Sequence, residues 1–427
     1  MKSKKIFIVI GFFCALCAWR PRPAGAEPGS LESQVADLTR AVRELTLTVE
    51  NQEREIALLK GQTPPPFTTT GQPPASAPGG RSLQGRWNPD IGAVADTVVK
   101  LDSPRSNEGG ADRVSLRELE LVLGSPVDPY SRLDATISFS DVEAAALEEA
   151  YYTHFGLPFA AAARVGKFKP RIGKVIGVHR DSIDTVDEPL VIRRYFGEEG
   201  YNKSGADVKI PLELPWEAAH EFSFGVLEGG NGDGGTLFGD SRRRPTLYAH
   251  LKNYVDLNDV SGLELGGSYL VGSRDDDATF EVNVLGLDAT LIHRYADQRH
   301  VKFQSEAFLV NKTESFTVTE DPATLDLVFD DVDDNRHLWG GYFLADWRFH
   351  PQWATGFRFD RVMLVDAPVD GPDSGDTGYT GYLTFYQSEF ARWRAQVTRL
   401  ELTDGHDDNQ ILVQGTFAIG EHKHKLS

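Results

Sequence analysis

Apolar and polar residues alternate with a period of two in one stretch after another between residues 86 and 420. From Leu133 to Phe139 every second residue is apolar, and Asp134, Thr136 and Ser138 stand between them. The same pattern recurs at 91–99, 221–226, 301–309, 341–349, 392–397 and 411–419. Successive side chains of a β-strand point to opposite faces, so the pattern predicts strands with one apolar face each. Residues 85–420 are therefore expected to form an all-β domain.

Turn and loop material separates these stretches, and counting them gives about sixteen strands, a number typical of barrels that enclose water. The separating segments include Ser125–Pro126, Gly229–Asp240, Arg274–Asp277, Asp330–Asn335 and Asp366–Gly378.

The first 26 residues have the features of a secretory signal peptide. Three lysines precede the apolar run Ile6–Ala18, and Ala24-Gly25-Ala26 fits the cleavage site. Both cysteines, Cys14 and Cys17, lie in this segment, so the mature chain is expected to have none. Removal of the segment, which has five basic residues and no acidic one, changes the net charge from −19 to −24. Such a charge argues against a nucleic-acid partner.

The mature sequence has no run approaching the roughly 18 apolar residues of a transmembrane helix. If the chain crosses a membrane, a closed barrel is the other way to satisfy every backbone group in hydrocarbon. The alternative is a soluble secreted β-protein, which at this length more often splits into domains joined by visible linkers. Many charges stand at mid-strand positions, including Arg358, Asp360, Arg392 and Arg394. Either an outer surface or a wet lumen suits them, and we favour a transmembrane antiparallel barrel in an outer membrane.

A heptad repeat precedes the barrel, within residues 27–62. Its apolar seam has valine or isoleucine at one position and leucine at the other, with one break at Gln52. This pattern predicts a short periplasmic coiled coil, and the pairing rule alone favours a dimer. A single amphipathic helix packed on another surface is the alternative. Residues 63–84, rich in proline, threonine and glycine, are expected to be a flexible linker, and 421–427 a C-terminal tail.

One segment is basic in an otherwise acidic chain. No acidic residue occurs between Arg164 and Arg180, and the following stretch 181–200 lacks alternation. A long loop folded into the lumen would bring this charge to the narrowest point, where basic side chains select anions. An exterior basic loop meeting lipid headgroups is an equal alternative. The candidate constriction residues are Lys167, Lys169, Arg171, Lys174, Arg180, Arg193 and Arg194.

The run Gly166-Lys167-Phe168-Lys169-Pro170-Arg171-Ile172-Gly173 resembles the phosphate-selective porin O and P family. Shorter words at 87–91, 117–121 and 127–130 support the resemblance. It implies a sixteen-stranded homotrimeric porin that passes small anions, and for this reason we read the coiled coil as three-stranded. Only Lys167, Lys169 and Arg171 match the motif; the other candidates come from charge alone.

Two features depart from that family. Such barrels usually end on an aromatic residue, whereas this chain continues past Phe417 to Ser427. The acidic net charge also opposes anion selectivity, although charges beyond about 8 Å are screened at physiological salt.

Other functions have less support in the sequence. No Gly-x-Ser-x-Gly, Gly-x-x-x-x-Gly-Lys or His-Glu-x-x-His motif occurs, so we expect no enzyme and no cofactor. His422 and His424 lack a third metal ligand, and the clusters at 275–277 and 330–334 lack calcium-loop spacing. The leading hypothesis is passive diffusion of small hydrophilic solutes, with phosphate or other anions as the expected preference. Its rival is a structural anchor that links the outer membrane to the cell wall through the coiled coil.

Overall fold

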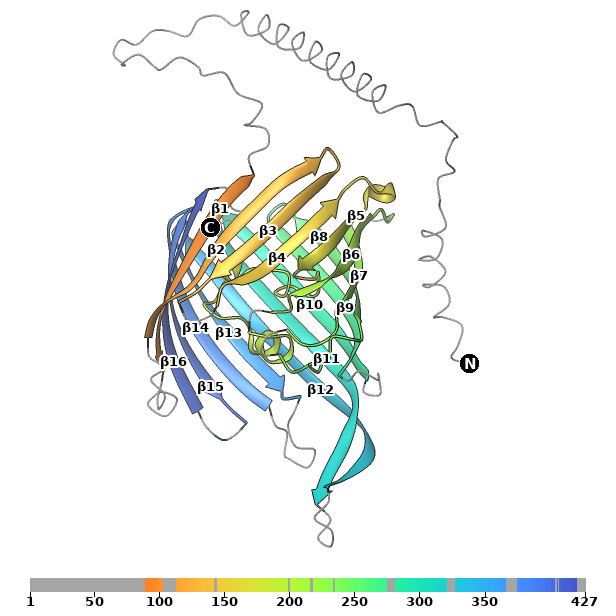
Figure 1. Ribbon diagram of the computed structural model, residues 1–427. Coiled ribbons are helices and arrows are strands. Elements are labelled where there is room, and N and C mark those ends of the chain that lie inside the picture. The colour runs from red at the N-terminus through yellow and green to blue at the C-terminus, as the bar shows by residue number, and fades with distance from the viewer. Residues whose placement is uncertain are drawn as a thin grey trace, which may run out of the picture. The chain divides into compact units, whose positions relative to one another are not determined.

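The computed structural model describes residues 89–102, 113–141, 144–198, 200–215, 218–232, 235–274, 281–320, 327–365, 375–403, 405 and 407–420. These residues form a closed antiparallel barrel of sixteen strands, as the sequence predicts (Figure 1). The expected signal peptide, coiled coil, linker and tail (1–26, 27–62, 63–84 and 421–427) lie outside the described residues.

The strands follow one another around the barrel in chain order. Their bounds are β1 Asp90–Asp102, β2 Arg113–Asp128, β3 Ser131–Phe139, β4 Ala146–His154, β5 Ala162–Phe168, β6 Lys203–Leu212, β7 Ala219–Leu227, β8 Thr246–Asn258, β9 Ser261–Ser273, β10 Glu281–Ala296, β11 Arg299–Glu320, β12 Leu327–His350, β13 Trp353–Met363, β14 Gly375–Ser388, β15 Ala391–Glu401 and β16 Asp407–Gly420.

The barrel closes between its first and last strands, where Gly92 pairs with Gly420 and Asp102 with Gln410. At the end of the barrel where β16 finishes, tight turns such as Pro129-Tyr130 join neighbouring strands. Longer connections join the strands at the opposite end, and the longest runs from β5 to β6.

The two faces of the barrel wall differ in polarity, as β15 illustrates. Trp393 and Val397 point outward and are 43% and 58% exposed, whereas Arg392 and Arg394 point inward and are buried. The period-two pattern therefore separates an apolar exterior from a charged interior.

Two segments expected to be loops are strands instead. Ser125–Pro126 lies in β2, where Pro126 pairs with Arg132 next to a register shift at the hairpin end. A proline is tolerated at such an irregularity, where a ladder hydrogen bond is already missing. Asp330–Asn335 lies in β12, in a part that pairs only with β11 (Figure 1). A two-stranded ribbon beyond the barrel rim needs no apolar face, so its polarity resembles that of a loop.

The apolar core lies inside the barrel, where side chains of the wall pack against the β5–β6 connection, residues 169–202, which we call the inner loop. It contains the short helices η3 (Arg180–Ser182) and α3 (Leu190–Tyr195). Phe196 stacks edge-on against Phe308 of β11 at 5.0 Å. A side chain at Gly340 of β12 would collide with Val191, so this glycine leaves the room that α3 occupies. None of the helices in the described ranges is long and apolar enough to cross a membrane.

Candidate functional site

The inner loop enters the barrel directly after β5, and one of its early contacts with the wall is made at a glycine. Gly173 has a φ of +58°, and a Cβ there would meet the Glu306 carboxylate. Its amide donates a hydrogen bond to Ser268 Oγ at 3.0 Å, and the Lys174 amide donates to Glu306 Oε1 at 3.0 Å. These contacts attach the beginning of the loop to β9 and β11, so the loop lies inside the barrel, one of the two placements that the sequence leaves open.

A second contact lies on β2 and β4, and irregular strand pairing creates it. In the β3–β4 ladder Thr136 pairs with Glu149 and Ile137 with Leu147, so Glu148 is an extra residue in a bulge. Both Glu148 and Glu149 are therefore buried on the lumen side, at 6% and 5% exposure. Together with Glu118 and Glu120 of β2, we call these carboxylates the acidic anchorage.

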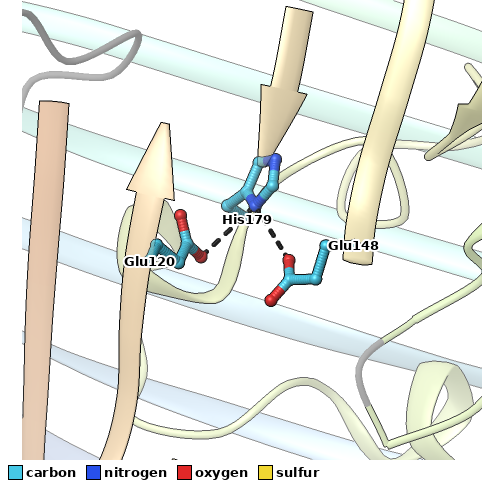
Figure 2. Close-up of side chains that lie close together, drawn as sticks. All are labelled: Glu120, Glu148 and His179. Carbon is cyan, nitrogen blue, oxygen red and sulfur yellow. Dashed lines mark ion pairs between the residues drawn. The ribbon is translucent and has the colours of Figure 1, made fainter. Parts of the chain in front are cut away.

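His179 of the inner loop inserts into the acidic anchorage. Its Nε2 lies 3.0 Å from Glu149 Oε2, and its Nδ1 lies 3.3 Å from Glu120 Oε1 and 3.4 Å from Glu148 Oε2 (Figure 2). Burial and Lys169 lower the pKa of His179, but the three carboxylates outweigh them and raise it well above the usual value. With no other cation bound, the His179 imidazole is therefore protonated and carries a positive charge beside these carboxylates.

Lys169 reaches the same carboxylates from the beginning of the loop. Its amide donates to Glu149 Oε1 at 2.8 Å, and its Nζ donates to the Val178 carbonyl at 3.4 Å. Burial lowers the pKa of the ammonium, whereas Glu188, Glu148 and other nearby carboxylates raise it, with a net increase. Lys169 is thus a buried counter-charge to the glutamates of the acidic anchorage.

The third contact lies on β11, β13 and β15. It is made by four cations that we call the basic anchorage: Lys302 of β11, Arg358 of β13, and Arg392 and Arg394 of β15. Lys302 Nζ lies 2.6 Å from Asp184 Oδ2. Arg392 donates to the Asp181 carbonyl at 2.5 Å.

Arg394 donates to two loop carbonyls, those of Thr185 at 2.6 Å and Ile183 at 3.1 Å. The wall arginines therefore hold the backbone carbonyls of Asp181, Ile183 and Thr185. Buried guanidinium groups suit this role because each presents several donors in a fixed plane.

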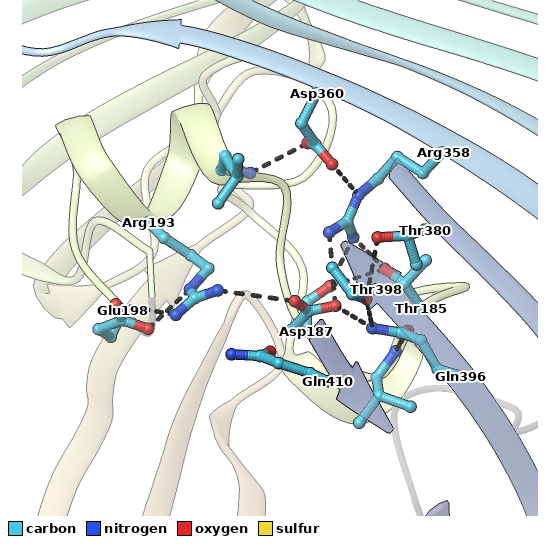
Figure 3. Close-up of polar contacts among 12 residues, drawn as sticks. Thr185, Asp187, Arg193, Glu198, Arg358, Asp360, Thr380, Gln396, Thr398 and Gln410 are labelled. Atoms are coloured by element: carbon cyan, nitrogen blue, oxygen red, sulfur yellow. Dashed lines mark hydrogen bonds and ion pairs between the residues drawn. The ribbon is translucent and has the colours of Figure 1, made fainter. Parts of the chain in front are cut away.

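Asp187 joins the loop to three wall and loop side chains (Figure 3). Gln396 Nε2 donates to its Oδ1 at 2.6 Å, Arg358 Nη2 lies 3.4 Å away, and Arg193 Nη1 lies 3.6 Å from Oδ2. Burial raises the pKa of Asp187, but Arg358 and Arg193 lower it more strongly, with a net decrease. Arg358 itself is 1% exposed and also pairs with Asp360 at 2.7 Å.

Of the seven residues predicted for a constriction, Lys167 alone lies outside the inner loop. It lies on β5 two residues after Val165, which is 57% exposed, so both side chains belong to the outer face of the strand. Its Nζ donates to the Leu147 carbonyl at 2.7 Å. Lys169 is buried in the acidic anchorage.

The other five contact acceptors within the barrel. Arg171 pairs with Asp207 at 2.9 Å, Lys174 with Glu264 at 2.5 Å, and Arg194 with Asp376 at 2.7 Å. Arg193 pairs with Glu198 at 2.7 Å, and Arg180 donates to the Glu198 carbonyl at 2.8 Å. The basic residues are thus spread along the loop, each beside an acceptor, and do not gather in one ring.

Sequence reasoning did not select His179, Asp187 or the glutamates of the acidic anchorage. Glu118 and Glu120 are two residues apart on one strand, so their side chains lie on the same face. This spacing could have indicated a charged lumen face. The adjacent Glu148 and Glu149 give no such signal, because regular alternation would put them on opposite faces.

An open pocket of about 180 Å³ separates the inner loop from β11, β12 and β13. Lys174, Ser182 and Asp184 line it on the loop side. Lys302, Tyr342 and Arg358 line it on the wall side. The pocket is polar, and charged side chains of both signs face it.

Comparisons with known proteins agree with this architecture. No family model matches the chain. It is 29% identical over 342 residues to an uncharacterized protein of Aquifex aeolicus (strain VF5), covering 72% of this chain and 69% of that protein. Among solved structures, OprB of Pseudomonas putida covers 79% of this chain and 95% of its own, with a TM-score of 0.53 and 10% identity.

The anion-selective porin from Comamonas acidovorans covers 78% of this chain and 99% of its own, with a TM-score of 0.51 and 10% identity. At sequence identities of 10%, the similarity to these two porins establishes a shared fold and nothing more. The chain has the fold of porin-type barrels, and no comparison links it to the phosphate-selective O and P family in particular.

Proposed function

We propose that this protein is an outer-membrane porin through which small hydrophilic solutes diffuse passively. The observation that carries the proposal is the closed sixteen-stranded barrel with an apolar outer face, a charged inner face and a loop folded inside. Membrane lipid and small solutes are then its partners.

The outer face supports the membrane location. Large apolar side chains are exposed on strands all around the barrel, among them Leu247, Leu285, Leu309, Trp339 and Ile411, each at least 43% exposed. Water-soluble monomers rarely expose apolar surface on this scale, whereas hydrocarbon covers it without cost. Export through the predicted signal peptide is part of the same proposal.

The pocket beside the inner loop supports the solute path. It lies between the loop and the wall formed by β11–β13, and charged groups that remain partly exposed line it. The side chains of Lys302 and Asp184 are 18% and 27% exposed there, so both can touch a hydrated solute. We place the narrowest part of the path at this pocket.

A modest preference for anions follows from the charges in the pocket. Lys174, Lys302 and Arg358 line it with a single carboxylate, that of Asp184. Carboxylates just outside, such as Glu264 and Asp360, pair with two of these cations and reduce the preference. A small anion is therefore favoured over a cation, while neutral solutes pass as well.

Single-channel recording in planar bilayers tests the proposal. A porin gives stable ohmic current steps, and a gradient of potassium chloride gives a reversal potential on the anion side. A barrel that serves only as an anchor gives no ohmic current, and this result would refute the channel function. Crosslinking in detergent, which should give a ladder ending at three copies, tests the homotrimer that the resemblance implies.

A further inference from the structure

The acidic anchorage has properties that attachment of the loop does not require. Glu118, Glu120 and Glu148 line a small cavity of about 10 Å³ together with Lys169 and Arg180. Glu120, Glu148 and His179 are each less than one-tenth exposed. We propose that Glu120, Glu148 and His179 bind one divalent transition-metal ion of the zinc class.

The spacing of the three ligand atoms fits such an ion. His179 Nδ1 lies 3.3 Å from Glu120 Oε1 and 3.4 Å from Glu148 Oε2, and all three ligand atoms lie within 4.8 Å of one another (Figure 2). Ligands about 2.0–2.1 Å from zinc in a tetrahedron are about 3.3–3.4 Å apart. Glu120 and Glu148 line the cavity together with Glu118, so Glu118 or a water molecule in the cavity is available to complete the coordination.

An outer carboxylate orients the histidine as metal sites require. Glu149 Oε2 lies 3.0 Å from His179 Nε2, so it accepts the Nε2 proton and leaves Nδ1 as the metal-binding nitrogen. The Glu149 side chain is held in turn, because its Oε1 accepts the Lys169 amide at 2.8 Å. Nδ1 then faces two carboxylates, so either a proton or a metal ion must stand between the nitrogen and these oxygens.

An unused ligand atom provides the second observation. Glu148 is 6% exposed, lines the cavity, and its Oε1 is buried with no hydrogen-bond partner among the described residues. Leaving a buried carboxylate oxygen without a donor is costly. A metal ion in the cavity removes that cost, since a carboxylate can bind it through one or both oxygens.

The local charge also favours a divalent ion. Four carboxylates, those of Glu118, Glu120, Glu148 and Glu149, meet two permanent cations among the described residues, Lys169 and Arg180, and Lys169 also lies beside the buried Glu188. With His179 neutral, two negative charges in this buried cluster lack a fixed counter-charge, and one divalent ion supplies both positive charges. The competing arrangement uses protons, one on His179 and one shared by the adjacent carboxyl groups of Glu118 and Glu148.

The site joins three separate parts of the chain, namely β2, β4 and the inner loop. A bound metal would therefore crosslink the loop to the wall inside the barrel. The proposal does not depend on channel activity, because its direct test is metal binding.

The test is zinc titration by calorimetry on the full mature chain, folded in detergent, stripped with chelator and carrying no affinity tag. His422→Gln and His424→Gln are included in every sample, so that tail histidines cannot contribute. We expect one zinc ion per chain in this parent protein. His179→Gln and Glu120→Gln should weaken binding at least tenfold, and Glu149→Gln by about 10–100-fold.

His250→Gln is the matched control, since His250 is a buried lumen histidine bonded to Ser268 and distant from the carboxylates. It should leave the affinity unchanged. A parent protein that binds no zinc, as the proton-sharing arrangement predicts, would overturn the proposal, and so would unchanged binding in His179→Gln. If a variant fails to fold, the cobalt-loaded parent decides alone: intense tetrahedral absorption bands are expected, and their absence contradicts the site.

Discussion

The inner loop meets the barrel wall on two sides that carry opposite charges, and the two sides differ in how completely those charges are compensated. In the basic anchorage, Lys302 and Arg358 pair with carboxylates, and Arg394 donates to loop carbonyls. In the acidic anchorage, carboxylates outnumber the permanent cations that reach them.

This difference separates two ways of holding a loop inside a barrel. On the basic side most of the ammonium and guanidinium donors meet acceptors within the protein, and Arg392 Nε is a buried donor without a partner among the described residues. The acidic side depends on protons or on a bound cation for its last positive charges. Attachment of the loop should therefore be sensitive to mutation at the basic anchorage and to pH and metal ions at the acidic anchorage.

The largest effect is expected from Asp187→Ala. It removes a carboxylate that faces Arg358 and Arg193 and leaves the buried Arg358 with less compensation, at a cost of about 3–5 kcal/mol. Lower thermal stability and noisier single-channel current should both follow. Asp407→Ala is the control, because Asp407 and its partner Arg399 have side chains 51% and 52% exposed, and such pairs contribute at most about 1 kcal/mol. Equal destabilisation by both changes would contradict a buried anchorage at Asp187.

A smaller effect is expected on the acidic side, and it should require metal. Zinc at about 100 times its dissociation constant should stabilise the parent protein by about 2.7 kcal/mol. In chelator, Glu120→Gln should change stability little, since it removes one of several excess carboxylates. Because its affinity is at least tenfold weaker, the same variant should gain at most about 1.4 kcal/mol at that zinc concentration when its thermal unfolding is measured with and without the ion. A full zinc response in this variant would contradict the assignment of Glu120 as a ligand.

A still smaller effect is expected on ion selectivity. Lys174→Gln removes a cation that lines the pocket and pairs with Glu264, so the anion-to-cation permeability ratio should fall about twofold, a few tenths of a kcal/mol. Lys167→Gln should leave the reversal potential unchanged, because Lys167 shares the outward parity of Val165. Identical shifts in the two variants would remove the pocket from the solute path.

The smallest effect is expected from acid, which should leave the contribution of Asp187 to stability unchanged until the pH is low. The pKa of Asp187 is depressed below the ordinary aspartate value of 3.8, because Arg358 and Arg193 outweigh burial, with Gln396 also bonded and Asp360 nearby. A depressed folded-state pKa contributes stability above the unfolded value, and this contribution is lost as the pH falls through the folded value. The Asp187 contribution, taken as the stability difference between wild type and Asp187→Ala, should therefore be constant from pH 8 to about 5 and shrink below about 4. A contribution that vanishes near pH 6 would contradict the contacts described for Asp187.

Much of the fold could be predicted because barrel strands carry their burial pattern locally. The alternation around Leu133, Phe303 and Trp393 marks β3, β11 and β15 without knowledge of their partners. The pattern fails where both faces meet water, as at Asp330–Asn335 in β12, and where a proline ends regular pairing, as at Pro126.

The site could be predicted much less. Basic residues at 169–194 correctly mark a special loop, but their partners lie far along the chain, as with Arg194 and Asp376 or Lys174 and Glu264. Such pairs exist only after the barrel closes. The inward turn of both Glu148 and Glu149 depends on a bulge, a register shift that one strand's sequence does not encode.

The central claim is that solutes pass between the inner loop and the wall formed by β11–β13. The native cysteines lie in the predicted signal peptide, so Ser182→Cys at the pocket gives a single reactive thiol in the mature chain. Labelling this thiol with a negatively charged sulfonate reagent should reduce single-channel conductance and anion preference together, whereas labelled Asp407→Cys should not change them. Unchanged current from a Ser182→Cys sample that mass spectrometry finds fully labelled would contradict the claim.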